Sequence, residues 1–114
     1  MITLWHNPRC TKSRAALAIL EEAGVPLTLR RYLEDAPSAA EITALHAALG
    51  RPPVIDMVRR GEKAFGELGL GPDSTDADLI AAMAAHPILI ERPVGLKDGR
   101  AVIARPPELI RSLL

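Results

Sequence analysis

Ten residues near the start of the chain join an apolar segment to a helical one, and they read Trp5-His6-Asn7-Pro8-Arg9-Cys10-Thr11-Lys12-Ser13-Arg14. The apolar run over residues 2–5 predicts a short strand, and Asn7-Pro8 predicts a turn. Apolar residues at helical spacing then predict a helix over residues 11–23, with Gly24 as its end. This order of strand, turn and helix places Cys10 at or just before a helix N-terminus.

Cys10 is the only cysteine of the chain, and its position favours a reactive thiol. The thiolate is the nucleophilic form, and a helix N-terminus with nearby cations lowers a thiol pKa from about 8.5 to roughly 3.5–7.5. Arg9, Lys12 and Arg14 are such cations, and the N–H groups of a helix start bind anions. The alternative is a buried cysteine that acts only as a small hydrophobic residue. We expect a reactive thiol in an anion-binding loop.

Composition argues against several classes of function. The 114 residues carry a formal net charge of zero, so no basic surface for nucleic acid is indicated. No apolar run is long enough to span a bilayer, and His6 and Arg9 interrupt any signal-peptide pattern. A single cysteine excludes an internal disulfide and favours a reducing compartment, so we expect a cytoplasmic protein. His6 and Cys10 are four residues apart, but His46 and His86 show no matching pair, so we expect no metal site.

The remaining strands follow from alternation and turn signals. Residues 25–32 predict a second strand, which completes a parallel, right-handed βαβ unit. Residues 94–97 and 100–104 predict two strands joined by Asp98-Gly99, the strongest two-residue hairpin signal. A short final helix is expected over residues 108–114.

Between the second strand and the hairpin, residues 36–86 predict a cluster of short helices. Ser38 with Glu41 forms a capping-box pattern, and Thr75 with Asp78 resembles a second cap. Glycine and proline residues separate the helical segments. The cluster is too short for us to expect it to fold alone, so we interpret it as an insertion.

The predicted order is β-α-β, helical insertion, β-β-α, which is the order of the thioredoxin and glutaredoxin fold with an insertion. We therefore expect a single α/β domain over residues 1–114, built on a thioredoxin/glutaredoxin-like mixed four-stranded sheet. In that fold the proline before the third strand is usually cis and faces the thiol. Arg92-Pro93 has this place, so we expect a cis bond there.

Several motifs in the same order resemble the glutaredoxin-coupled, thioredoxin-fold arsenate reductases, the ArsC family. In chain order they are His6-Asn7-Pro8-Arg9-Cys10 with Ser13-Arg14, Arg31-Tyr32-Leu33-Glu34, Glu67-Leu68-Gly69-Leu70 and His86-Pro87-Ile88-Leu89-Ile90-Glu91-Arg92-Pro93. The resemblance covers nearly the whole chain. It points to a shorter subfamily, because longer members continue past the position of Leu113. Spx-type regulators, which bind RNA polymerase, are related to this family.

The resemblance implies a set of site residues. Cys10 matches the catalytic cysteine, and His6 matches the histidine that supports the thiolate. The family's three anion-binding arginines fall on Arg92, on Arg105, and on Arg59 or its neighbour Arg60. Arg14, one helical turn after Cys10, is a further candidate for the anion, because arginine presents a permanently charged fork to oxyanions. Supporting roles fall on Asn7, Ser13 and Pro93.

The leading hypothesis is reduction of arsenate to arsenite. The Cys10 thiolate attacks bound arsenate, and Ser13 stands where a dithiol protein has its second cysteine, so an outside thiol has to finish the reaction. The resemblance implies glutathione as external reductant and glutaredoxin as partner, with no bound cofactor. Alternatives are a glutathione-dependent monothiol oxidoreductase and an Spx-like regulator. The phosphatase-fold arsenate reductases use C-x5-R, which the alanine at position 16 excludes.

Overall fold

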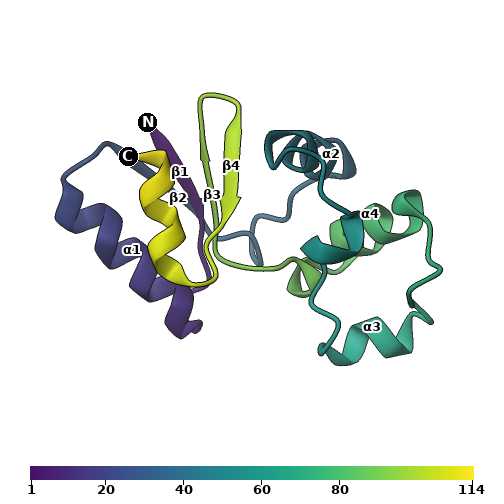
Figure 1. The fold of residues 1–114 in the computed structure, drawn as a ribbon. Helices are drawn as coiled ribbons and strands as arrows, with labels where there is room; N and C mark the ends of the chain where they lie inside the picture. Colours follow the sequence, from purple (N-terminus) through teal and green to yellow (C-terminus); the bar gives the residue numbers. More distant parts are fainter. The chain divides into compact units, whose positions relative to one another are not determined.

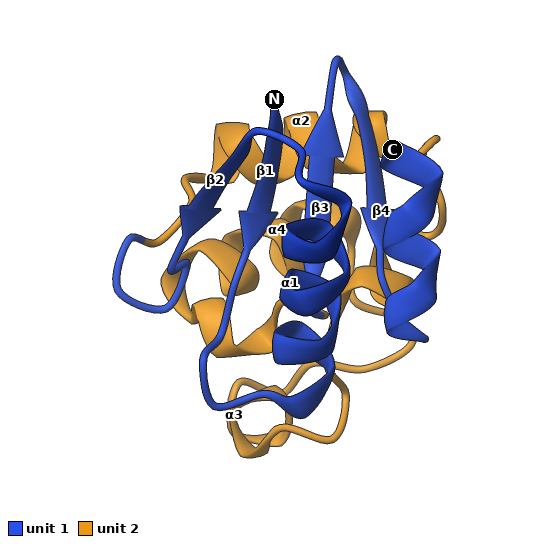
Figure 2. Ribbon diagram, turned by 90° about the vertical axis from the view of Figure 1, so that its left-hand side faces the viewer, with its two compact units in different colours: residues 1–35, 92–114 blue, residues 36–91 orange.

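The computed structural model describes all residues, 1–114, and the chain divides into two compact units. The first unit comprises residues 1–35 and 92–114, and the second comprises residues 36–91 (Figure 2). No helix has the length and apolar character that crossing a membrane requires.

The first unit contains one mixed sheet with two helical segments. Its strands are β1 (Ile2–Trp5), β2 (Leu27–Arg30), β3 (Val94–Lys97) and β4 (Arg100–Ile103), and its helical segments are α1 (Thr11–Ala23) and the 3₁₀ helix η3 (Pro107–Leu113). The strand order is β2-β1-β3-β4, with β2 parallel and β3 antiparallel to β1. Figure 1 shows α1 and η3 on the same face of this sheet. The expected four-stranded mixed sheet is confirmed.

Local signals explain where these elements end. Gly24 ends α1 in the left-handed conformation, with φ of 69°. Asp98 and Gly99 both have positive φ, as a two-residue hairpin turn requires. The second strand is shorter than predicted, because Pro26 precedes it and it ends at Arg30. The predicted final helix is 3₁₀ throughout, since it is only seven residues long and starts after Pro106 with Pro107, which donate no backbone hydrogen bonds.

The core of the first unit lies between the sheet and its two helical segments. It is formed by Ile2, Leu4, Ala16, Leu20, Ala104, Ile110 and Leu113. Gly95 on β3 lies under η3, and a Cβ at this position would clash with the side chains of Ile110 and Leu113. The glycine therefore permits η3 to pack close to the sheet, and this packing fixes the position of the segment that follows β4.

The second unit is helical, as the sequence predicts. It contains α2 (Ala39–Ala48), η1 (Val54–Met57), α3 (Lys63–Glu67), α4 (Asp76–Ala85) and η2 (Pro87–Leu89). The capping box of Ser38 with Glu41 is present, and the Thr75 hydroxyl accepts the N–H of Asp78 at 3.1 Å, so both predicted caps are confirmed. The segment η2 was not predicted, and the unit continues to Glu91. That the two units form one domain stays a prediction.

Candidate active site

Cys10 is the residue that caps the N-terminus of α1. Its backbone is extended, with φ of −92° and ψ of 121°, and its carbonyl accepts the N–H of Arg14 at 3.0 Å. Asn7 and Pro8 turn the chain after β1, and the Cys10 N–H donates to the Asn7 carbonyl at 3.0 Å. The turn therefore presents the sulfur at the helix start, where N–H groups have no partner inside the helix. The thiol is half-buried and forms no disulfide.

The surroundings of the sulfur lower the pKa of the Cys10 thiol. Burial acts in the opposite direction and raises it, but the backbone N–H of Ser13, the Arg92 side chain and the N–H of Lys12 outweigh burial. These groups lower the pKa because they stabilise the thiolate, and the Arg92 charge adds to their effect. The loop and helix start thus favour the nucleophilic form of Cys10.

The Arg92 guanidinium lies against this sulfur. Burial lowers the Arg92 pKa, but the neighbouring Cys10 and the phenol of Tyr32 outweigh burial and raise it. Tyr32 directly follows Arg31 after β2 and is fully buried. The resemblance gave Tyr32 no role, although it lies in the Arg31-Tyr32-Leu33-Glu34 motif. The signal available in the sequence was a single tyrosine at the end of the predicted second strand.

His6, Asn7 and Ser13 form a buried cluster beneath the cysteine loop. Their exposed fractions are 5%, 6% and 0%. The Ser13 hydroxyl shares a 2.6 Å hydrogen bond with Nδ1 of His6 and accepts the Asn7 N–H at 3.1 Å. Burial lowers the His6 pKa, and the charges of Arg31 and Arg14 lower it further against the opposing effect of Glu21. The lowered pKa favours the neutral form of His6, which contacts Ser13, and the Ser13 N–H in turn stabilises the Cys10 thiolate.

Arg14, which we expect to be an anion ligand, is bonded within the loop. One of its terminal nitrogens donates to the Pro8 carbonyl at 2.8 Å, and the other donates to the Thr11 hydroxyl at 3.3 Å. The Arg9 N–H similarly donates to the Asn7 side-chain oxygen at 3.0 Å. These bonds fix the loop conformation around Cys10.

Arg105 and Pro93 lie next to Arg92 along the backbone. The Arg105 guanidinium donates to the Arg92 carbonyl at 2.9 Å. The Arg92-Pro93 bond is cis, as predicted, and the Arg105-Pro106 bond is also cis, which the sequence did not indicate. The structure thus brings Cys10, Arg92 and Arg105 into one part of the first unit.

Arg59 belongs to the second unit and lies between two carboxylates there. Its Nε is 3.1 Å from an oxygen of Glu62, and its Nη1 is 3.1 Å from an oxygen of Glu91. Its neighbour Arg60 is more exposed and pairs loosely with Asp56 at 3.9 Å. Arg59 is thus the more firmly oriented of the two candidate arginines.

Comparisons with known proteins identify relatives over the full length of the chain. The model of the ArsC family matches residues 5–113. An arsenate reductase from Neisseria meningitidis is 41% identical, with 99% of this chain and 97% of the relative covered. One from Rhizobium meliloti is 40% identical, with 99% and 81% covered. The structure of an arsenate reductase from Vibrio cholerae has a TM-score of 0.94 at 42% identity, with 99% and 97% covered, which confirms the predicted thioredoxin-like α/β class.

Proposed function

Because this chain belongs to the ArsC family, we propose that it is an arsenate reductase whose nucleophile is the Cys10 thiolate. The observation that carries the proposal is the Cys10 sulfur, which lies against the Arg92 guanidinium and the N–H groups of a helix start. This arrangement favours a thiolate and also provides donors for a tetrahedral oxyanion. The names of the full-length relatives support arsenate as that oxyanion.

In the first step, arsenate binds over the Cys10 sulfur. Arg92 and Arg105 supply positive charge in this unit, and the N–H groups of α1 supply further donors. The thiolate forms a bond to arsenic, and one arsenate oxygen takes up two protons and leaves as water. Arsenic remains in its pentavalent state. Arg92 contributes by holding both the thiolate and the negative charge that develops on the oxygens.

The second step needs a thiol from outside the chain, because Cys10 is the only cysteine. Glutathione is the reductant that the family resemblance implies. Its sulfur forms a disulfide with the Cys10 sulfur, and the electron pair of the arsenic–sulfur bond stays on arsenic. Two thiols are thereby oxidised to one disulfide while pentavalent arsenic is reduced to arsenite. A glutaredoxin thiolate then attacks the glutathione sulfur of this disulfide, forms its own disulfide with glutathione and releases the Cys10 thiolate.

A coupled assay tests this proposal. NADPH consumption is followed with arsenate, glutathione, glutathione reductase and glutaredoxin for the wild type, Cys10→Ser and Arg111→Gln. Arg111 is an exposed arginine on η3, and Arg111→Gln serves as the control for a substitution outside the site. We expect arsenate-dependent turnover in the wild type and control and none in Cys10→Ser. Turnover that persists in Cys10→Ser would refute the proposal.

A glutathione-dependent monothiol oxidoreductase is the second candidate. It is favoured by the Cys10-Thr11-Lys12-Ser13 sequence at the start of α1, in which the activated thiol has no second thiol beside it. Reduction of a glutathionylated model disulfide by the wild type, without arsenate turnover, would establish this function instead. The Spx-like alternative and the cytoplasmic location stay predictions.

A further inference from the structure

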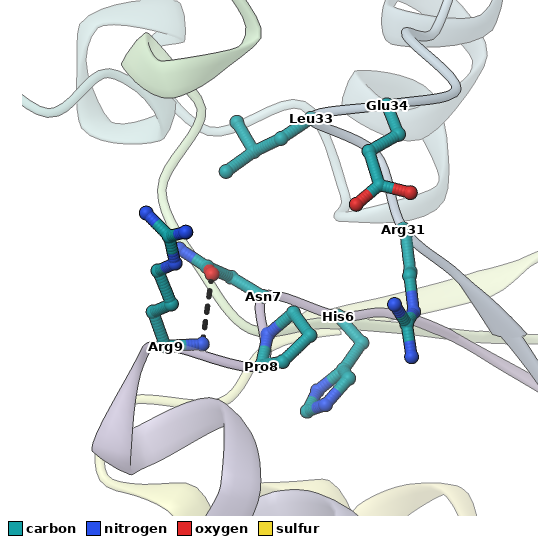
Figure 3. Close-up of a pocket in the computed structure, with 7 residues that line it drawn as sticks. All are labelled: His6, Asn7, Pro8, Arg9, Arg31, Leu33 and Glu34. Atoms are coloured by element: carbon teal, nitrogen blue, oxygen red, sulfur yellow. Dashed lines mark hydrogen bonds between the residues drawn. The ribbon is translucent and has the colours of Figure 1, made fainter.

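A pocket of about 410 Å³ opens beside the cysteine loop of the first unit. Residues 6–9 line it from the loop, and Arg31, Leu33 and Glu34 line it from the turn that follows β2. Its volume lies within the roughly 300–1,000 Å³ of small-molecule sites. Figure 3 shows Arg9 on one side of the pocket and Arg31 and Glu34 on the opposite side. The reaction steps described above use none of these three charged side chains.

The three charged side chains are available to a ligand. Arg9, Arg31 and Glu34 are exposed, and their charged groups make no hydrogen bond or ion pair within the chain. The neighbouring Arg30 differs, because its guanidinium lies 5.4 Å from the Trp5 ring and its Nε is bonded to Asp35. The structure therefore uses Arg30 for packing and leaves Arg31 at the pocket.

The charges form a definite pattern across the pocket. Arg31 and Glu34 present one positive and one negative group from a single turn, which the hydrogen bond from the Glu34 N–H to the Arg31 carbonyl closes at 3.0 Å. Arg9 presents one positive group from the other side. A ligand that complements this pattern has a carboxylate and an ammonium group at one end and a lone carboxylate at the other.

We propose that this pocket binds glutathione, with the γ-glutamyl end against Arg31 and Glu34 and the glycine carboxylate against Arg9. The inference rests on the proposed function, which makes glutathione the reductant. A γ-glutamyl-cysteinyl-glycine peptide carries an α-carboxylate and an ammonium at its first residue and a carboxylate at its last. Its cysteine lies between them, over Pro8 and beside the residues that directly precede Cys10. Leu33 and Pro8 offer apolar contact to its methylene groups.

Binding of S-methylglutathione tests the pocket without any chemistry at Cys10. This probe keeps every charge of glutathione and cannot form a disulfide or reduce arsenic. Titration of the reduced protein, followed by calorimetry, gives the Kd for the wild type, Arg31→Gln, Glu34→Gln and the control Arg111→Gln. We expect each pocket variant to weaken binding about tenfold, because each removes one charged hydrogen bond. The control keeps the wild-type Kd.

A derivative of the probe tests the orientation. Acetylation of the α-amino group removes the ammonium that Glu34 binds in the proposal. The wild type then prefers S-methylglutathione to its N-acetyl form by about tenfold, and Glu34→Gln loses this preference. Glu34→Gln also leaves in place the Arg31 charge that lowers the His6 pKa, so its effect is separate from any change at His6.

The outcomes separate the pocket from the proposed function. Binding that weakens as expected, in a protein without arsenate turnover, supports the pocket and overturns the arsenate proposal. Glutathione-dependent arsenate turnover together with unchanged Kd values in both pocket variants overturns the pocket and leaves the function standing. No binding of S-methylglutathione to the wild type also overturns the pocket.

Discussion

Arg92 and Arg59 are both partly buried arginines that the family resemblance puts forward for the anion, Arg59 with Arg60 as its alternative, yet the structure gives them different neighbours. Arg92 lies against the Cys10 thiol and the Tyr32 phenol. Arg59 lies between the carboxylates of Glu62 and Glu91, each at 3.1 Å. Arg92 therefore stabilises the thiolate, whereas the charge of Arg59 is already balanced by two carboxylates. An arginine side chain thus activates the Cys10 thiol in the first unit, and another belongs to an ion-pair cluster in the second.

The largest effect on arsenate turnover that we predict is the loss of Arg92, which we compare with the loss of Arg59. Arg92→Met loses charge both at the thiolate and at the arsenate oxygens, so kcat/KM for arsenate falls about 100-fold or more. Arg59→Met loses a charge that two carboxylates already balance, and its effect is smaller. The coupled arsenate assay measures both. Equal losses in the two variants would contradict the difference that we draw between them.

The next prediction compares the two units through one glycine in each. Gly95→Ala places a Cβ against Ile110 and Leu113, so we expect a loss of about 1–3 kcal/mol in the free energy of unfolding. Gly66 in α3 has open space where a Cβ would lie, and Gly66→Ala instead stabilises the protein by about 0.5–1 kcal/mol. Urea denaturation measures both changes. A Gly95→Ala protein as stable as the wild type would contradict the close packing of η3 on β3.

A smaller effect is expected from freeing Arg59. Glu91→Gln removes one carboxylate from Arg59 but keeps the size of the side chain. The loss of this partly exposed ion pair makes the Arg59 charge available to the anion, so we expect the KM for arsenate to fall about two- to fivefold. Asp56→Asn, which removes the partner of Arg60, is the matched control and leaves the KM unchanged. A KM that falls only in the Asp56→Asn variant would assign the anion contact to Arg60.

The sequence predicted the first unit best where a local signal marks each boundary. The apolar run to Trp5 and the stop at Gly24 give β1 and α1 their observed limits, and Asp98-Gly99 gives the hairpin. Pattern alone did not distinguish α from 3₁₀ helix at η1 and η3, because seven or fewer residues carry too few turns for periodicity.

For the site, the motifs name candidate residues, and their contacts are seen only in the structure. Cys10 and Arg92, which the motifs put forward from opposite ends of the chain, lie together. The bonds of Arg14 to its own loop, of His6 to Ser13 and of Arg59 to two carboxylates depend on side-chain geometry that spacing does not encode. The unpaired charges of Arg31 and Glu34 become visible only when the pocket is known.

The most direct test of the account is the titration of Cys10 in the wild type and in Arg92→Met. Cys10 is the only thiol, so the thiolate absorbance in the ultraviolet, or the pH dependence of alkylation, reports this group alone. Above the pKa the thiolate predominates and alkylation is fast, and below it the thiol is protonated and alkylation is slow. We predict a wild-type midpoint below the ordinary value of about 8.5 and a higher midpoint in Arg92→Met. A wild-type midpoint at or above the ordinary value, or the same midpoint in both proteins, would contradict the account.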